Sequence, residues 1–264
     1  MKIMVTVKQV PDTSGKVAVN DDGTLNRASM QTIINPDDLN AVEEALSLKD
    51  EYGCKVVAFT MGPMQAEPML RELLAMGVDE TVLISGREFG GSDTYATSQI
   101  IAAAIDTYGI DDDDIIIAGR QAIDGDTAQV GPQIAEKMDL PQVTYVKNFA
   151  MADDMKTITV ERALEDGHEV IEIQTPCMLT AIKELNTPRY MNIAGIYNPD
   201  KKITVWNAAD IEVDLTTVGL KASPTNVFRS FTPKPKGKGM MLAGDTEKDL
   251  AKDLLIRLKD KHVI

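Results

Sequence analysis

The chain has 264 residues, of which 44% are hydrophobic and 26% charged, a balance typical of a soluble globular protein with a proper core. It carries 27 Lys and Arg against 41 Asp and Glu. The resulting net charge of -14 argues against nucleic acid as the main partner. With two widely separated cysteines, Cys54 and Cys177, and two histidines, we expect neither a disulfide framework nor a metal site.

The N-terminal stretch "MKIMVTVKQV" is charged at its second residue and apolar for only a few positions. It lacks the apolar core and the cleavage site of a signal peptide. No apolar run approaches the roughly 20 residues that a membrane span needs. We therefore expect a cytoplasmic protein without a membrane span.

Short apolar runs alternate with amphipathic segments of helical length. Strands are expected at Lys2–Lys8, Lys55–Thr60, Thr81–Ser85 and Asp114–Ala118. Helices are expected at 36–52, at about Gln65–Met76, from Ser92 or Asp93 to Gly109, and at about Thr127–Met138. This alternation predicts an α/β fold with a doubly wound, mainly parallel, Rossmann-like sheet that is covered on both faces.

The first of these helices has well-marked ends. Asn35 can cap it, Pro36 occupies its first position, Asp37 and Asp38 lie in its first turn, and Gly53 follows its last residue.

Two β-hairpins and a C-terminal region extend this pattern. The hairpins are expected at residues 17–27, turning at Asp22-Gly23, and at 157–173, turning at Asp166-Gly167, before a further strand at 176–182. We expect one α/β domain at 1–200. Residues 201–264 would form an extended arm and a helix at Asp245–Lys261, which packs either on its own domain or on another subunit.

The stretch "IIIAGRQAIDGDTAQVGPQIAE" at 115–136 reads as a buried strand, a sharp turn and a helix start. Ligands bind beyond the carboxyl ends of parallel strands, and the N–H groups of a helix start attract phosphate. Gly119 and Gly125 would let the backbone approach a ligand, and Gly125 can adopt positive φ. These residue types also suit an ordinary strand-to-helix turn, so composition alone leaves nucleotide binding open.

The side chains of this turn suggest further roles. Thr127 and Gln129 would donate hydrogen bonds, and Arg120 would offset the charge of a pyrophosphate. Asp124 and Asp126 would repel phosphate, so we expect them to cap the helix or to accept from a ribose hydroxyl. Loops at 6–12, 35–38, 60–63 and 90–97 would lie at the same sheet edge and help to enclose adenine, ribose and phosphates.

The motifs "VKQVPD", "NPDDLNAVEEAL", "TMGP", "AMGVD", "GRQAIDGDTAQVGP" and "ELNTPRYMNIAGI" occur in collinear order over nearly the whole chain. Together they closely resemble the β subunit of electron-transfer flavoproteins. The resemblance implies an adenine-nucleotide-binding fold and a heterodimer with an α subunit that carries FAD, on which residues 201–264 would dock.

The resemblance also implies a set of cofactor-binding residues. These are Thr6, Lys8, Asn35, Pro36, Asp37, Asp38, Met61, Gly62, Gly119, Arg120, Gln121, Ala122, Ile123, Asp124, Gly125, Asp126, Thr127, Ala128, Gln129 and Val130. Ordinary members of the family hold AMP there, whereas electron-bifurcating members hold a second FAD and accept hydride from NADH. AMP-binding members tend to carry three aspartates where this chain has Asp124-Gly125-Asp126, so we expect FAD in the space that Gly125 opens.

The bifurcating branch implies a role in anaerobic energy metabolism. One electron would pass to ferredoxin or flavodoxin and the other, through the α-subunit FAD, to an acyl-CoA dehydrogenase. Because the cofactor performs the redox step, no catalytic residue is named. Lys8 and Arg87 would place charge near the cofactors, or would be solvated surface residues.

The segment at 184–196 resembles the family's partner-recognition loop. By that resemblance Pro188, Arg189, Tyr190 and Ile193 would bind the dehydrogenase, with Ile193 as the aliphatic anchor where many members carry Leu. The same residues could instead pack under their own loop.

Three rival functions remain. The nearest is an ordinary AMP-holding flavoprotein β subunit that carries electrons passively. The second is an ATP-using enzyme, since "GGSD" at 90–93 matches part of the pyrophosphatase loop but lacks its first and last Ser. The third is a nucleotide sensor without a redox role.

Overall fold

The computed structural model describes residues 1–12, 31–197, 203–228 and 236–264. They belong to two compact units, Met1–Ser230 and Phe231–Ile264. The boundary lies later than the expected residue 200, because β11 (Ile203–Trp206) pairs in parallel with β5 (Glu80–Ile84) of the main sheet. The first unit contains the sheet and its cleft.

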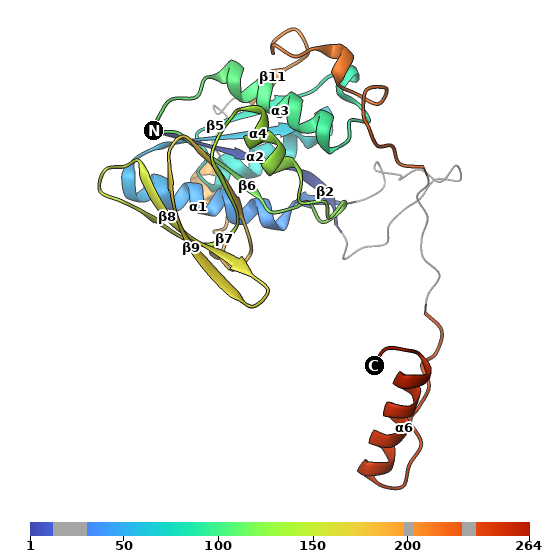
Figure 1. Ribbon diagram of the computed structural model, residues 1–264. Helices are drawn as coiled ribbons and strands as arrows, with labels where there is room; N and C mark the ends of the chain where they lie inside the picture. Colours follow the sequence, from blue (N-terminus) through green and yellow to red (C-terminus); the bar gives the residue numbers. More distant parts are fainter. Residues whose placement is uncertain (13–30, 198–202, 229–235) are drawn as a thin grey trace. The chain divides into compact units, whose positions relative to one another are not determined.

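The first unit is built on a nine-stranded sheet with the order β11-β5-β4-β1-β6-β10-β7-β8-β9 (Figure 1). Its remaining strands are β1 (Lys2–Thr6), β4 (Lys55–Met61), β6 (Ile115–Gly119), β7 (Gln142–Met151), β8 (Thr157–Leu164), β9 (Gly167–Gln174) and β10 (Cys177–Ala181). All pairs from β11 to β7 are parallel, and only β8 and β9 run antiparallel to their neighbours. The predicted mainly parallel α/β sheet is confirmed.

Helices cover both faces of this sheet (Figure 1). The longer ones are α1 (Pro36–Tyr52), α2 (Glu67–Met76), α3 (Thr94–Tyr108) and α4 (Val130–Lys137). Short elements complete the unit: β2 (Gln9–Pro11) paired with β3 (Thr32–Ile34), α5 (Ile193–Ile196), and the 3-10 turns η2 (Met64–Ala66), η3 (Arg87–Phe89) and η4 (Leu215–Thr217).

The core lies in two layers because successive side chains of a strand point to opposite faces. Ile3 and Val5 of β1 pack in one layer, with the buried residues of α1 and α2. Met4, between them, packs in the other layer with residues of α3 and α4. A strand buried on both faces is typical of a doubly wound sheet.

Local sequence signals set the ends of several helices. Gly53 adopts φ 69° after α1 and donates its N–H to the Lys49 carbonyl, as a left-handed C-terminal glycine does. Asp93 caps α3 by accepting from the Ala96 N–H. The hairpin turning at Asp166-Gly167 is confirmed as β8 and β9, whereas the hairpin expected at Asp22-Gly23 lies outside the described residues.

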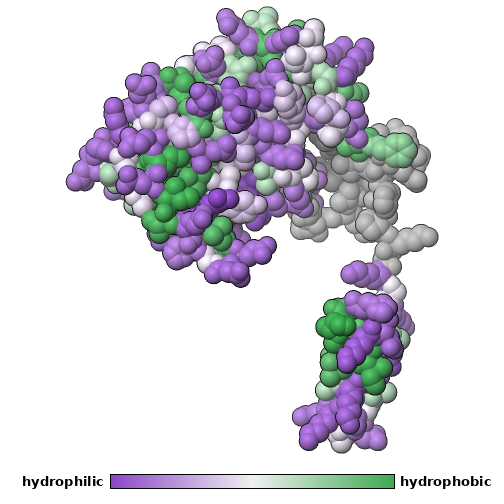
Figure 2. Space-filling model, viewed as in Figure 1, coloured by the Kyte–Doolittle hydropathy of each residue, from purple (hydrophilic) through white to green (hydrophobic). Residues whose placement is uncertain are grey.

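The second unit contains α6 (Glu247–Asp260), which Thr246 caps by accepting from the Asp249 N–H. Leu254, Leu255 and Ile256 are exposed there, and hydrophobic residues gather on one side of the helix (Figure 2). None of the helices in the described ranges combines the length and apolar character that a bilayer span requires.

Gly119 should be indispensable to the fold. A Cβ at this position would overlap the Asp38 carboxylate and lie 2.6 Å from the backbone of Asp37 and Asp38. We predict that Gly119→Ala lowers the free energy of unfolding by about 1–3 kcal/mol or more, because α1 must move away from β6. Gly125→Ala is the matched control, since a Cβ there would meet nothing within 4 Å. Urea denaturation that ranks the two variants equally would contradict this account.

Candidate functional site

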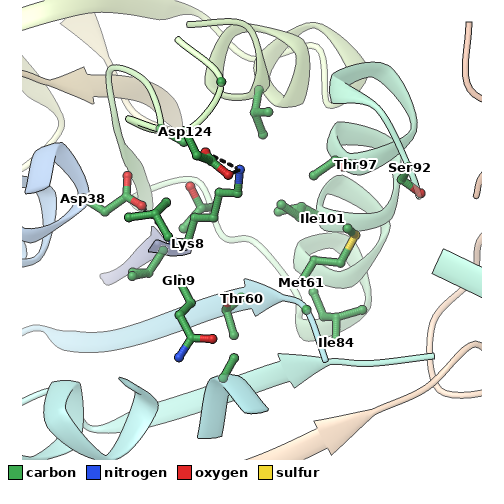
Figure 3. A pocket seen from close by; sticks show the side chains of 18 of the residues that line it. Lys8, Gln9, Asp38, Thr60, Met61, Ile84, Ser92, Thr97, Ile101 and Asp124 are labelled. Atoms are coloured by element: carbon green, nitrogen blue, oxygen red, sulfur yellow. Dashed lines mark hydrogen bonds and ion pairs between the residues drawn. The ribbon is translucent and has the colours of Figure 1, made fainter. Parts of the chain in front are cut away.

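A cavity of about 760 Å³ opens at the carboxyl ends of β1, β4, β5 and β6. The switch point of the sheet lies between β1 and β6, because the chain runs outward from β1 to β4 and β5 on one side and then returns to β6 on the other side of β1. Open α/β sheets bind ligands in the crevice at such a point. Figure 3 shows Lys8 after β1, Thr60 and Met61 of β4, and Ile84 of β5 around the cavity.

Asp38 joins the two strands that flank the switch point. Its Oδ2 accepts the Lys8 N–H at 2.8 Å, and its Oδ1 accepts the Gly119 N–H at 3.1 Å. The residue is buried. Burial raises the pKa of Asp38 to about 7, although the hydrogen bonds from both backbone amides act to lower it. The first turn of α1 is therefore fastened to both strand ends through one carboxyl group.

Asn35 has a different role from the predicted helix cap. It precedes α1, but its side chain makes no capping hydrogen bond. Its Nδ2 donates to the Gln121 carbonyl at 2.8 Å, and its Oδ1 accepts the Ile123 N–H at 3.0 Å. Asn35 thus occupies the predicted N-cap position of α1, but its side chain pins the turn after β6 in place of making a capping hydrogen bond.

Arg120 and Asp37 form an ion pair beside the cavity. The Arg120 Nε lies 3.2 Å from the Asp37 Oδ2, although neither atom makes a hydrogen bond. Burial raises the pKa of Asp37, and the nearby guanidinium acts against this rise. The guanidinium carbon also lies 5.8 Å from the centre of the Tyr145 ring. Arg120 lines the cavity, and its expected contact with a pyrophosphate stays a prediction.

The turn before α4 is longer than expected. Helix α4 begins at Val130 and not at Thr127, because Asp126 and Ala128 adopt φ of 50° and 52°, outside the right-handed helical region. Gly125, for which positive φ was a possibility, is not among the residues that adopt it.

The polar side chains of this turn are engaged away from the helix start. Helix α4 has no side-chain cap, so the prediction that Asp124 or Asp126 caps it was wrong. Asp124 pairs with Lys8, and Asp126 accepts from the Gln121 Nε2 at 2.9 Å. The Gln129 Oε1 accepts from a Thr94 hydroxyl of α3 at 2.8 Å. A ribose contact of either aspartate stays a prediction.

The cavity wall includes many of the predicted cofactor residues. The predicted residues that line it are Thr6, Lys8, Asp38, Met61, Gly62, Gly119, Arg120, Ala122, Asp124, Gly125, Thr127 and Val130. The predicted residues outside the wall are Asn35, Pro36, Asp37, Gln121, Ile123, Asp126, Ala128 and Gln129. Arg87 is exposed in η3 and also lies outside the wall.

Several wall residues were not in the predicted cofactor set. Those in strand-end loops that we had assigned to the sheet edge are Val7, Gln9, Val10, Pro11, Thr60, Pro63, Gly90, Gly91, Ser92, Asp93, Thr94 and Thr97. Others carried no sequence signal for a site: Thr32, Gln65, Ala66, Ile84, Ser85, Gly86, Phe89, Ile101, Ala118 and Gly131. The second group comes from strands, helices, 3-10 turns and the loop after β5, and only the fold brings these residues to the cavity.

A separate surface is formed by the segment expected to recognise a partner. Tyr190 and Ile193 are 95% and 75% exposed, and neither packs under its own loop. Helix α5 lies close to α2, since a Cβ on Gly195 would approach the Ala75 carbonyl oxygen to 2.6 Å. Pro188 is half-buried. The segment therefore presents apolar side chains outward from a fixed base.

Arg189 supplies part of that base. Its Nε donates to both Glu43 carboxylate oxygens at 2.9 and 3.1 Å, and its backbone N–H donates to Oε2 at 2.9 Å. Its Nη1 donates to Asp50 at 2.8 Å. These bonds to α1 hold the guanidinium within this chain, so any direct contact between Arg189 and a partner stays a prediction.

The fold defines a Rossmann-like α/β protein with a cleft at the switch point of its sheet, and sequence comparison supplies the family. The family model described as "Electron transfer flavoprotein domain" matches residues 22–211. The chain is similar to the acryloyl-CoA reductase electron transfer subunit gamma of Anaerotignum propionicum, with 58% identity over 270 residues and 100% coverage of both chains.

Two further relatives match over 100% of both chains. The caffeyl-CoA reductase-Etf complex subunit CarD of Acetobacterium woodii is 52% identical over 266 residues. The electron transfer flavoprotein subunit beta of Clostridium acetobutylicum is 51% identical over 265 residues. The chain belongs to the electron-transfer flavoprotein family, as a β-type subunit.

Asp38 should leave a mark on the pH dependence of stability. Its folded pKa of about 7 exceeds its ordinary value of 3.8, so the folded protein binds this proton more tightly than the unfolded chain. The contribution of Asp38 to stability therefore falls as the pH rises from about 4 to about 7. We predict that wild type loses stability relative to Asp38→Asn over this window, measured by urea denaturation at about pH 5 and about pH 8. Parallel profiles would rule out the raised pKa.

Proposed function

We propose that this chain pairs with a flavoprotein α subunit and holds FAD in the cleft beside β1 and β6. The pair would oxidise NADH, delivering one electron to ferredoxin or flavodoxin and the other, through the α-subunit FAD, to an acyl-CoA dehydrogenase. The names of two relatives support the last partner, because they refer to an acryloyl-CoA reductase and a caffeyl-CoA reductase.

The observation that carries the proposal is the setting of Gly125. It lines the cavity, and a Cβ there would meet nothing within 4 Å. The position lies between Asp124 and Asp126, so an acidic residue would add a third adjacent negative charge and fill part of the space. Glycine leaves that space empty and adds no negative charge, so an anionic dinucleotide would be repelled less.

The cavity suits such a ligand. Its volume lies in the upper part of the range of small-molecule and cofactor sites. Backbone N–H groups of the turn and the Lys8 and Arg120 side chains would hold phosphates, and the apolar wall at Met61 and Ile101 would exclude water. When bound, FAD would supply the hydride and single-electron chemistry.

The C-terminal unit fits a dependent subunit. Leu254, Leu255 and Ile256 are between 43% and 59% exposed, and no residue of α6 is buried. An amphipathic helix of this kind gains most of its stability from packing its apolar side. We therefore propose that the arm and α6 dock on the α subunit.

Cofactor extraction tests the proposal against its rivals. The chain should be co-expressed with its α subunit, and the flavin and adenylate in the purified pair counted. Two FAD per pair together with NADH oxidation is expected, whereas one FAD and one AMP would leave the passive carrier as the function. A pair without flavin would favour the sensor. Mg-ATP hydrolysis by the isolated chain would instead favour the ATP-using enzyme.

Charge at position 125 should control the cofactor of this subunit. We predict that Gly125→Asp loses its β-subunit FAD, with affinity at least about tenfold weaker, because a carboxylate would face the phosphates. The α-subunit FAD should be retained. Gly125→Asn is the matched control of nearly equal size without the charge. Unchanged flavin content in the Asp variant would count against the site.

Ile193 should act at a partner interface and not at the cofactor. We predict that Ile193→Ala slows electron delivery to the acyl-CoA dehydrogenase by on the order of tenfold, because an exposed aliphatic anchor is lost. Flavin content should not change. Val170→Ala on β9 is the control, since Val170 is a similarly exposed aliphatic residue, at 64%. Equal coupling in both variants would remove the anchor assignment.

A further inference from the structure

Lys8 and Asp124 form an ion pair at the mouth of the cleft. The Lys8 Nζ lies 2.7 Å from Oδ1 and 2.9 Å from Oδ2 of Asp124. Lys8 follows β1 and Asp124 lies in the turn after β6, so the pair connects the two loops that flank the switch point (Figure 3). Both residues line the cavity.

In this ion pair the backbone of Lys8 is held in place, whereas its side chain can move. The backbone of Lys8 is fixed, because its N–H donates to the buried Asp38. Its side chain is 49% exposed, and that of Asp124 is 20% exposed. A lysine side chain has a flexible four-carbon stem and a compact charge, so it can change partner while its backbone stays in place.

The other charged side chains that line the cavity also have partners within the chain. Of the described residues that line it, the cationic ones are Lys8 and Arg120, and Arg120 pairs with Asp37. Asp38 accepts two backbone N–H groups, and Asp93 accepts from the start of α3 and from Thr225. Lys8 is the more exposed of these two cations, at 49% against 33% for Arg120, so it is the cation that an incoming anion reaches most readily.

The energies make an exchange feasible. An ion pair as exposed as this one contributes about 0–1 kcal/mol. A phosphate group offers more negative charge and several strong acceptor oxygens, and its bonds to ammonium groups are charge-assisted. Once Lys8 turns to a phosphate, Asp124 is left as an unpaired negative charge beside the same ligand.

We propose that a phosphate-bearing nucleotide displaces Asp124 from Lys8, and that Asp124 thereby determines how tightly the cleft binds anionic ligands. This inference rests on the proposed nucleotide site and deepens it. Asp124 acts as an internal competitor that weakens binding of phosphates but does not weaken binding of an uncharged nucleoside. Lys8 is the group for which Asp124 and the phosphate compete.

Calorimetric titration of the full chain with its α subunit, after removal of bound nucleotide, tests this inference. The probes are ADP and adenosine. Asp124→Asn should bind ADP about three- to tenfold more tightly than wild type, and should not bind adenosine more tightly. Lys8→Met should bind ADP more weakly. Asp126→Asn is the matched control, because it removes a neighbouring charge that does not line the cavity.

A double-mutant cycle separates exchange from simple repulsion. If Lys8 is the shared partner, Asp124→Asn strengthens ADP binding more in wild type than in the Lys8→Met background. An equal gain in both backgrounds would overturn the exchange, since repulsion by Asp124 would then explain it. Unchanged ADP affinity in Asp124→Asn would also overturn it while leaving the nucleotide site intact. Wild-type protein that binds no adenine nucleotide would instead refute the proposed function.

Discussion

The cleft depends on one buried carboxyl group, that of Asp38, which connects three parts of the fold. It accepts backbone N–H groups from the end of β1 and the end of β6 while lying in the first turn of α1. A side chain on Gly119 would overlap it, so glycine and aspartate at these positions require each other. Burying this carboxyl group carries a desolvation cost that its hydrogen bonds do not fully offset, and the raised pKa of Asp38 reflects that cost. This unfavourable desolvation is located beside the cleft, at the ends of β1 and β6.

The cleft beside the ends of β1 and β6 is shaped mainly by backbone positions and has only two cationic side chains among its described lining residues. Asn35 fixes the turn after β6, and Gly125 leaves part of the wall open. Lys8 and Arg120 each have an acidic partner, so the site carries its own counter-charges and adds little net charge. Membership of the electron-transfer flavoprotein family is consistent with so few charged side chains, because the cofactor proposed for this cleft would perform the redox chemistry while the protein supplies position and potential.

Local signals in the sequence were sufficient for much of the fold. The Pro36 start and Gly53 end of α1 were predicted correctly, because a fixed φ and a left-handed glycine act within a few residues. The start of α4 was predicted too early, since positive φ at Asp126 and Ala128 depends on how tertiary contacts hold the turn. Likewise, β10 inserts between β6 and β7, and Lys8 meets Asp124 across 116 positions. No local sequence pattern predicts either pairing. The hydrogen bonds from Asn35 to the turn after β6 likewise join residues that are far apart in the sequence.

The most direct measurement is a crystal structure of the complex between this chain and its α subunit, purified with its native cofactors. The account predicts continuous density for an FAD in the cleft, with its pyrophosphate at the turn between β6 and α4 and its path passing Gly125. Density that ends at the first phosphate, or a nucleotide bound away from the β1–β6 switch point, would contradict it.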